Sequence, residues 1–216
     1  MKLWQLLFWF VTIKAVQSKG YSYMGKIFYL MGKSGSGKDT VYKYIKEQLP
    51  ELKNIVIYTT RPIRSDEIDG VAYHFSNDAQ LEAFQQEGKV IELREYNTVH
   101  GIWKYFTVDD GQFDTQEHSL AIGTLESYVQ MKEYFGAEKM VPLYIEVDDG
   151  LRLERALNRE RKQTAPKYEE MCRRFLADAK DFCEENLSKA GIEVRYQNVD
   201  LEKCVNEIIL GIKENM

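Results

Sequence analysis

The sequence predicts an α/β fold, a three-layer sandwich in which helices cover both faces of a parallel central sheet. Two observations lead to this prediction. Short apolar runs alternate along the chain with longer segments whose apolar residues recur every three or four positions, as in strands and helices. Glycine and proline separate many of these segments. Strands that alternate with helices form parallel sheets, because each crossover returns the chain to the same end of the sheet.

The composition limits the expected partners. The chain has 216 residues, enough for one domain with insertions, and a formal net charge of −5. Proteins that bind long nucleic acids usually carry a basic excess, so we expect no nucleic acid polymer as a partner. The three cysteines are widely spaced, without a Cys-x-x-Cys pair, which predicts reduced thiols in a cytoplasmic protein. No membrane contact is expected of residues 24–216, and the sequence indicates no oligomeric state.

Residues 1–23 form an N-terminal extension of uncertain role. Its apolar run over residues 3–13 is too short to span a bilayer comfortably. A signal or tether, an added leader, and a start codon placed too early are three open interpretations. We favour an extension without function, because everything after Met24 is typical of a reduced intracellular enzyme.

The alternating pattern begins around a glycine-rich loop. Residues 26–31 are mostly apolar and predict a buried strand that leads into this loop. Residues 39–49 carry apolar side chains four positions apart, which predicts a helix that ends before Pro50. Residues 54–59 predict a second buried strand.

The segment 60–111 interrupts the alternation and predicts an inserted lobe. It contains an expected helix capped by Asn77 and Gln80, followed by expected strands over 90–96 and 102–108. The segment is too long for a simple crossover and too regular for a loop. After it the alternation returns, with strands expected at 120–124, 141–147 and 192–196 and helices at 126–135, 150–162, 167–189 and 201–213.

The strongest motif lies between the first strand and the first helix, as a phosphate-binding loop requires. Its glycines let successive backbone N–H groups point at one anion, and the helix N-terminus adds partial positive charge. Lys38 can reach the outer phosphates of a nucleotide as a mobile cation. The motif predicts a P-loop NTPase scaffold that binds ATP, as co-substrate, through Gly32, Lys33, Ser34, Gly35, Ser36, Gly37, Lys38, Asp39 and Thr40.

Asp39 departs from the usual motif, in which Ser or Thr follows the lysine and binds Mg²⁺. A carboxylate is a hard oxygen ligand that suits Mg²⁺, directly or through water. Thr40 comes one position later and offers its hydroxyl. Mg²⁺ is therefore the expected cofactor, with Asp39 and Thr40 as candidate ligands whose division of roles stays open.

A second motif lies downstream of the loop. Arg61 and Arg64, three positions apart, form a fork suited to a phosphate, and Tyr73 can add a hydroxyl. Residues 59–75 closely resemble the substrate signature of guanylate kinases, TTR-x-x-R-x-x-E-x-x-G-x-x-Y-x-F. Together with the loop, this signature makes residues 24–216 similar to that family, in a divergent bacterial branch.

The resemblance implies a site for GMP. By similarity, Arg61, Arg64 and Tyr73 hold the GMP phosphate, and Glu67 falls on a further signature position. Glu92 matches the glutamate that recognises guanine. This role is chemically consistent, because guanine presents an N1–H and an amino group side by side and one carboxylate accepts from both.

The resemblance also implies a helical lid over about residues 155–170. Arg155 and Arg159 match paired arginines that approach the phosphates, and Arg174 matches one on the following helix. With Lys38, these arginines are the expected catalytic cations. Without the two motifs, the same segment is typical of a solvated charged helix.

Three departures from the family pattern weaken the expected guanine contacts more than the phosphate contacts, and one is that Ile57 or Tyr58 replaces a family serine that touches the base. Family members usually carry aspartates after the strand expected at 120–124, and here Thr124 or Glu126, or neither, takes their place. The Tyr-Gly-Ser/Thr that follows the guanine glutamate has its nearest counterpart at residues 99–102, without a clean match.

These features predict transfer of the γ-phosphoryl group from ATP to GMP, with dGMP as a further acceptor. Positioning and charge neutralisation suffice for this chemistry, so we expect no nucleophile or general base. One alternative is a kinase on the same scaffold that acts on another monophosphate or a phosphorylated sugar. The other is a non-catalytic guanylate-kinase-like module that binds protein partners, which the retained Lys38 and lid arginines argue against.

Overall fold

The computed structural model describes residues 25–64, 67–71, 73–98, 101–113 and 116–216. The N-terminal extension over residues 1–23 lies outside these ranges. So do residues 99–100, which belong to the expected counterpart of the Tyr-Gly-Ser/Thr sequence at 99–102. Among the helices of the described ranges, none is long and apolar enough to cross a membrane.

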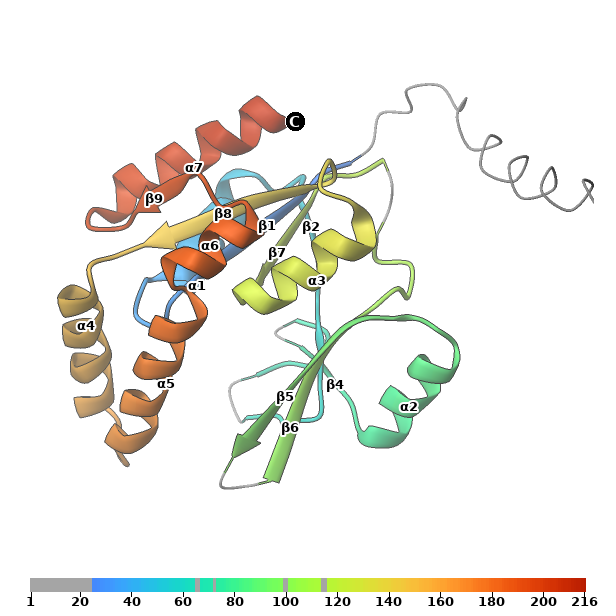
Figure 1. Cartoon of the computed structure of the whole chain (residues 1–216), viewed down its shortest axis with the longest axis horizontal. Coiled ribbons are helices and arrows are strands. Elements are labelled where there is room, and N and C mark those ends of the chain that lie inside the picture. The colour runs from blue at the N-terminus through green and yellow to red at the C-terminus, as the bar shows by residue number, and fades with distance from the viewer. Residues whose placement is uncertain (1–24, 65–66, 72, 99–100, 114–115) are drawn as a thin grey trace, which may run out of the picture.

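A five-stranded sheet forms the middle layer of the molecule (Figure 1). All its strand pairs are parallel. At its centre, β1 (Ile27–Gly32) lies between β7 (Ser119–Gly123) and β8 (Met140–Glu146), with Phe28 opposite Leu120 and Val141. This position explains why the sequence of β1 is almost continuously apolar, since a central parallel strand is covered on both faces. The spatial order is β2 (Lys53–Asn54), β7, β1, β8 and β9 (Arg195–Gln197).

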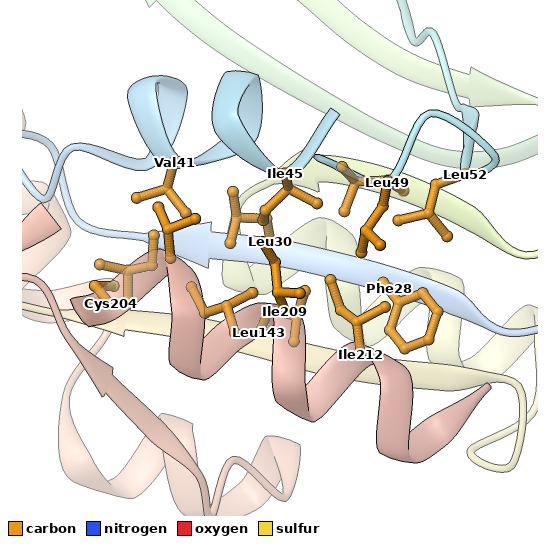
Figure 2. Packing of buried hydrophobic residues seen from close by; sticks show 14 of the residues in the cluster. Phe28, Leu30, Val41, Ile45, Leu49, Leu52, Leu143, Cys204, Ile209 and Ile212 are labelled. Atoms are coloured by element: carbon orange, nitrogen blue, oxygen red, sulfur yellow. The ribbon is translucent and has the colours of Figure 1, made fainter. Parts of the chain in front are cut away.

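Helices cover both faces of this sheet, which confirms the predicted three-layer sandwich. Successive side chains of a strand point to opposite faces. Phe28 and Leu30 therefore pack against α1 (Lys38–Gln48) and α7 (Leu201–Asn215), as Figure 2 shows. Tyr29 belongs to the opposite cluster, which contains buried residues of α3 (Leu125–Phe135) and α6 (Glu184–Ala190).

A second, smaller sheet carries the lobe that interrupts the alternation (Figure 1). Its order is β4 (His74–Phe75), β3 (Tyr58–Thr59), β6 (Gly101–Val108) and β5 (Val90–Thr98), and β5 and β6 form an antiparallel pair. Leu81 of α2 (Asp78–Gln86) packs with Phe106 and Val108 of β6. The expected helix cap is present, since the Asn77 side chain accepts a 3.0 Å hydrogen bond from the backbone N–H of Gln80.

The single strand expected over residues 54–59 is wrong. Lys53–Asn54 forms β2 in the central sheet, whereas Tyr58–Thr59 forms β3 in the second sheet. The chain leaves the central sheet after Ile55, whose N–H still donates to the carbonyl oxygen of Leu120. The apolar run gave no sign of this change, because both sheets bury the same kinds of side chain.

The single helix expected over residues 167–189 is also wrong, because it is two helices. The first, α5 (Tyr168–Asp181), ends at Phe182, and α6 follows from Glu184. Asn186 donates from Nδ2 to the carbonyl oxygens of Lys180 and Asp181 at the end of α5. The break lets Phe182 turn inward and stack on Tyr144, with ring centroids 5.6 Å apart.

Candidate functional site

The glycine-rich loop lies at the carboxyl end of β1 and leads directly into α1. Gly35 and Gly37 have φ of 81° and 82°, in the left-handed region that favours glycine. A Cβ on Gly35 would also come within 2.8 Å of the carbonyl oxygen of Arg152. The backbone of the loop therefore packs closely against α4 (Asp149–Arg161), and the loop ends at the N-terminus of α1.

A cavity of about 320 Å³ opens beside this loop. Helices α4 and α5 stand at the same end of the molecule and supply its arginines (Figure 1). Four of the lining residues are cations and one is a carboxylate, so the cavity suits a polyanion. It is lined by Ser34, Gly35, Gly37, Lys38, Asp39, Thr40, Arg155, Arg159 and Arg174.

Three of the predicted ATP-binding residues do not line this cavity, and each shapes the loop instead. A Cβ on Gly32 would lie 2.8 Å from both the carbonyl oxygen of Ile145 and Ser36 Oγ, so the loop starts where only glycine fits. Lys33 Nζ lies 3.3 Å from Asp149 Oδ1. Ser36 is buried, and its carbonyl oxygen accepts a 2.7 Å hydrogen bond from the Asn198 side chain.

Two of the three cavity arginines are held by hydrogen bonds to neighbouring groups. Arg155 donates from Nη2 to the carbonyl oxygen of Asn198 at 3.0 Å. Arg174 donates from Nε to Glu170 at 2.7 Å. Hydrogen bonds from Arg173 and then Arg174, together with their charges, lower the pKa of Glu170 to about 2, although burial opposes them. Glu170 therefore stays ionised and orients Arg174.

Arg152 is a loop contact that the sequence analysis missed. Its side chain is fully buried, and Nη1 donates to the carbonyl oxygen of Ser34 at 2.8 Å. Nε and Nη2 donate to Asp149 Oδ1, and the guanidinium lies 4.5 Å from the ring centroid of Phe175. Asp178 of α5 accepts the Ser34 N–H at 2.7 Å. Nothing in a charged helical pattern distinguishes this arginine from a solvated one.

The predicted phosphate fork is asymmetric. Arg61 is buried and donates from Nη1 and Nη2 to the two carboxylate oxygens of Glu67, at 3.0 and 2.7 Å. Glu67 also accepts the backbone N–H of Arg64 at 2.9 Å. The Arg64 side chain is exposed, so Arg64 is the accessible arm and Glu67 holds Arg61 in place.

Tyr105 is a second residue that sequence reasoning missed. Its ring makes edge-to-face contacts with Tyr73 and Tyr96, at centroid distances of 5.7 and 5.6 Å. The Arg61 guanidinium lies 5.3 Å from the Tyr73 ring centroid. Burial raises the pKa of Tyr73, with smaller contributions that include the charge of Asp39. Tyr73, Tyr105 and Tyr96 therefore form a row of tyrosines in the lobe, with Arg61 beside Tyr73.

Both carboxylate oxygens of Glu92 already accept hydrogen bonds from other side chains. Arg94 donates to it from Nε at 2.8 Å and from Nη2 at 3.1 Å, and Thr107 Oγ1 donates at 2.7 Å. Burial is the largest single influence and lowers the pKa of the Arg94 guanidinium, but the charge of Glu92, its hydrogen bond and smaller contributions from neighbouring tyrosines together raise that pKa. A signal was available in the sequence, since residues two apart on a strand share a face. The role of Glu92 in recognising guanine stays a prediction.

Thr124 stands at the carboxyl end of β7 as the N-cap of α3. Its Oγ1 accepts the Ser127 N–H at 3.2 Å, and it lies 3.3 Å from Arg94 Nη1. The neighbouring Glu126 is exposed. The hydroxyl of Thr124 therefore serves the helix cap and the Glu92–Arg94 pair.

The two candidate Mg²⁺ ligands, Asp39 and Thr40, lie in the first turn of α1, where both are exposed and line the cavity. Over the described part of the chain, no cluster of three or more His, Cys, Asp or Glu residues could hold a metal by itself. Mg²⁺ commonly takes one or two protein oxygens and completes its shell with substrate phosphates and water. The donor set at α1 fits that pattern.

Comparison with known proteins finds sequence similarity in the part of the chain that contains the glycine-rich loop and most of the lobe. Residues 24–104 match the family model described as guanylate kinase. The chain is 38% identical over 74 residues to the guanylate kinase of Mycolicibacterium paratuberculosis, covering 34% of this chain and 33% of that protein. It is 42% identical over 67 residues to the guanylate kinase of Thermobifida fusca, covering 31% and 34%. The matched segment thus spans about a third of the length of these relatives.

The fold is shared over a much longer stretch. The crystal structure of guanylate kinase from Anaplasma phagocytophilum superposes with a TM-score of 0.60 and covers 90% of this chain and 88% of that one. Sequence identity over this alignment is 22%, so the match concerns the fold.

Proposed function

We propose that this chain, a relative of the guanylate kinases in the sequence of residues 24–104 and in its fold, transfers the γ-phosphoryl group of ATP to a nucleoside monophosphate, with GMP as the leading acceptor. The observation that carries the proposal is the cavity beside the glycine-rich loop, where Lys38 meets three arginines from α4 and α5. Cations from three separate elements converge there on a space of about 320 Å³, as a bound polyphosphate requires.

The protein's task in this chemistry is positioning and charge stabilisation. The transferred group spreads negative charge over its oxygens, and fixed cations lower the barrier because they need no reorganisation. In this proposal Lys38 holds the outer phosphates of ATP, and Arg155, Arg159 and Arg174 lie against the group in transfer. A single arginine of this kind contributes roughly 10³–10⁵-fold, or about 4–7 kcal/mol.

Asp39 and Thr40 would hold Mg²⁺ together with the nucleotide phosphates. When bound, the ion supplies positive charge that neutralises the phosphate oxygens. Asp39 is the one carboxylate among the residues that line the cavity, so in the absence of the ion it would repel the phosphates. We therefore expect ATP affinity to depend on Mg²⁺ in the wild-type protein and to depend on it less in Asp39→Asn.

The lobe supplies the acceptor side of the proposed reaction. In this proposal the exposed Arg64 contacts the acceptor phosphate, and Arg61, which is held by Glu67 and lies against the Tyr73 ring, adds positive charge behind it. The lobe and the helices α4 and α5, which carry the cavity arginines, are separate parts of the fold. Their closure around both substrates would exclude water and suppress ATP hydrolysis.

A coupled assay of ADP release, with ATP, Mg²⁺ and one acceptor at a time, tests the proposal. GMP, dGMP, AMP, UMP and CMP form the acceptor panel, and we expect turnover with GMP and dGMP. Lys38→Ala should lower the rate by roughly 10²–10³-fold. Lys43→Ala is the matched control, since Lys43 lies on the same helix with its side chain 77% exposed and outside the cavity. Turnover with none of the five would contradict the proposal.

One observation favours a wider choice of acceptor. The carboxylate of Glu92 is already bonded to Arg94 and Thr107, so the lobe offers phosphate contacts more plainly than guanine contacts. The same scaffold could therefore phosphorylate another monophosphate or a phosphorylated sugar. Turnover with such an acceptor at a rate above that for GMP would favour this alternative.

A further inference from the structure

The Glu92–Arg94 pair is a closed unit. Arg94 donates from Nε to one oxygen of the carboxylate and from Nη2 to the other, and Thr107 Oγ1 donates to the second as well. The side chain of Glu92 is 0% exposed and that of Arg94 is 5% exposed. Three donors thus occupy both oxygens of Glu92, inside the protein.

The register of β5 against β6 and a contact with the central sheet hold the Glu92–Arg94 pair in place. Glu92 and Arg94 point to the same face of β5, and the register of β5 against β6 sets Thr107 opposite Glu92. Arg94 Nη1 reaches Thr124 Oγ1, at the start of α3, at 3.3 Å. The unit therefore joins the lobe to the carboxyl end of the central sheet, and it contains the glutamate that resembles the guanine-recognising residue of the guanylate kinases.

Arg94 presents to Glu92 the same hydrogen-bonding pattern as the edge of guanine. The Nε–H and Nη2–H groups of a guanidinium are two parallel donors. The N1–H and 2-amino group of guanine are also two parallel donors. A guanine that bound Glu92 in this way would have to expel Arg94 and leave a buried cation without its partner, which is costly.

We propose that Arg94 is a specificity-determining residue that keeps Glu92 from recognising the 2-amino group, so that the acceptor site takes GMP and IMP alike. The inference rests on the proposed function, because it concerns the acceptor of that reaction. IMP is the informative probe, since it differs from GMP only in lacking the 2-amino group.

The test measures kcat/KM for GMP and IMP with ATP and Mg²⁺, and dissociation constants for both nucleotides by calorimetry without turnover. Wild-type protein should show a GMP-to-IMP ratio within about threefold of one. Arg94→Met frees the carboxylate, and the ratio should rise by about 10- to 100-fold, the range expected for one hydrogen bond to a charged group. The double variant Arg94→Met/Glu92→Gln should return the ratio to near one.

A matched control is available on the same strand. Glu95 points to the opposite face of β5 and is exposed, so Glu95→Gln should keep the wild-type ratio. The ratio in the wild-type protein is itself a complete test, which matters if Arg94→Met fails to fold.

Two results would overturn the role of Arg94 and leave the proposed function standing. One is a wild-type preference for GMP over IMP of tenfold or more that Glu92→Gln abolishes. That result would mean that Glu92 leaves Arg94 and binds guanine in the wild-type protein. The other is a folded Arg94→Met protein with an unchanged ratio. If calorimetry detects binding of neither nucleotide, the proposed function fails first, and this inference fails with it.

Discussion

The Nη1 atom of Arg152 donates a 2.8 Å hydrogen bond to the carbonyl oxygen of Ser34 and so joins α4 to the glycine-rich loop. Asp178 of α5 accepts the N–H of the same residue at 2.7 Å. Both backbone polar groups of Ser34 are therefore bonded to the two helices that supply the cavity arginines. Movement of either helix is thereby coupled to the shape of the loop.

Replacing Arg152 with Met should loosen the loop. The variant loses the donor to Ser34 and leaves Asp149 without its arginine, so we expect the free energy of unfolding to fall by about 2–3 kcal/mol. We also expect the dissociation constant for ATP to rise about tenfold, equivalent to about 1.4 kcal/mol. Urea denaturation and titration with a fluorescent ATP analogue measure the two effects. Arg161→Met, at an exposed position of the same helix, is the control. Unchanged ATP affinity would show that the contact has no role in positioning the loop.

Arg173 and Arg174 form a natural matched pair on α5. Both donate to Glu170, and their side chains are 54% and 53% exposed, but only Arg174 lines the cavity. Arg174→Met should lower kcat by roughly 10³–10⁵-fold if Arg174 contacts the group in transfer. Arg173→Met should leave kcat within about threefold. Each variant should lose less than about 1 kcal/mol of stability, because exposed ion pairs contribute little. Equal effects on kcat would refute the assignment of Arg174.

Glu67 should make the stability of the protein depend on pH in the acid range. The hydrogen bond from Arg61 is the largest influence and lowers the pKa of Glu67 below its ordinary value of 4.5, although burial opposes it. A carboxylate whose pKa is lower in the folded state stabilises the protein above its unfolded pKa, and that stability is lost as the pH falls through the folded pKa. We therefore expect Glu67→Gln to cost about 2 kcal/mol at pH 7 and progressively less below about pH 4.5.

Denaturant unfolding of the wild-type protein and Glu67→Gln between pH 7 and pH 3 gives this difference directly. Glu82→Gln, at an exposed position of α2 in the same lobe, is the control and should show no such trend. A cost that stays constant across this range would mean that the Arg61–Glu67 pair does not carry the effect.

Gly123 should be essential for packing at the end of β7. A Cβ at this position would lie 2.0 Å from Tyr29 Oη and 2.9 Å from Ser127 Oγ. We expect Gly123→Ala to destabilise the protein by about 1–3 kcal/mol through overpacking. Tyr29→Phe removes the nearest atom, so the double variant should recover part of this loss. Denaturant unfolding of the wild-type protein, the two single variants and the double variant measures the coupling between the two positions. Strictly additive losses of stability would contradict the predicted clash between Gly123 and Tyr29.

The sequence by itself was sufficient for features that are local or periodic. The glycine-rich loop is nine contiguous residues, and its position between a strand and a helix follows from the periods on either side. The layered α/β architecture follows from alternation of the same two periods. Six of the nine predicted loop residues line the cavity, and Lys38 and the three predicted arginines meet there.

Tertiary structure decided the features that depend on which distant groups become neighbours. The apolar run near Ile55 contributes to two sheets, and the long charged helix breaks at Phe182, because burial can be satisfied in more than one way by the same pattern. Arg152 looks like any surface arginine until the loop passes beneath α4, 118 residues away in sequence. Glu92 matched a base-recognising glutamate in the sequence, but the pairing of β5 with β6 surrounds its carboxylate with Arg94 and Thr107. A motif specifies which chemical groups are present, whereas long-range packing specifies which of their hydrogen bonds are already made.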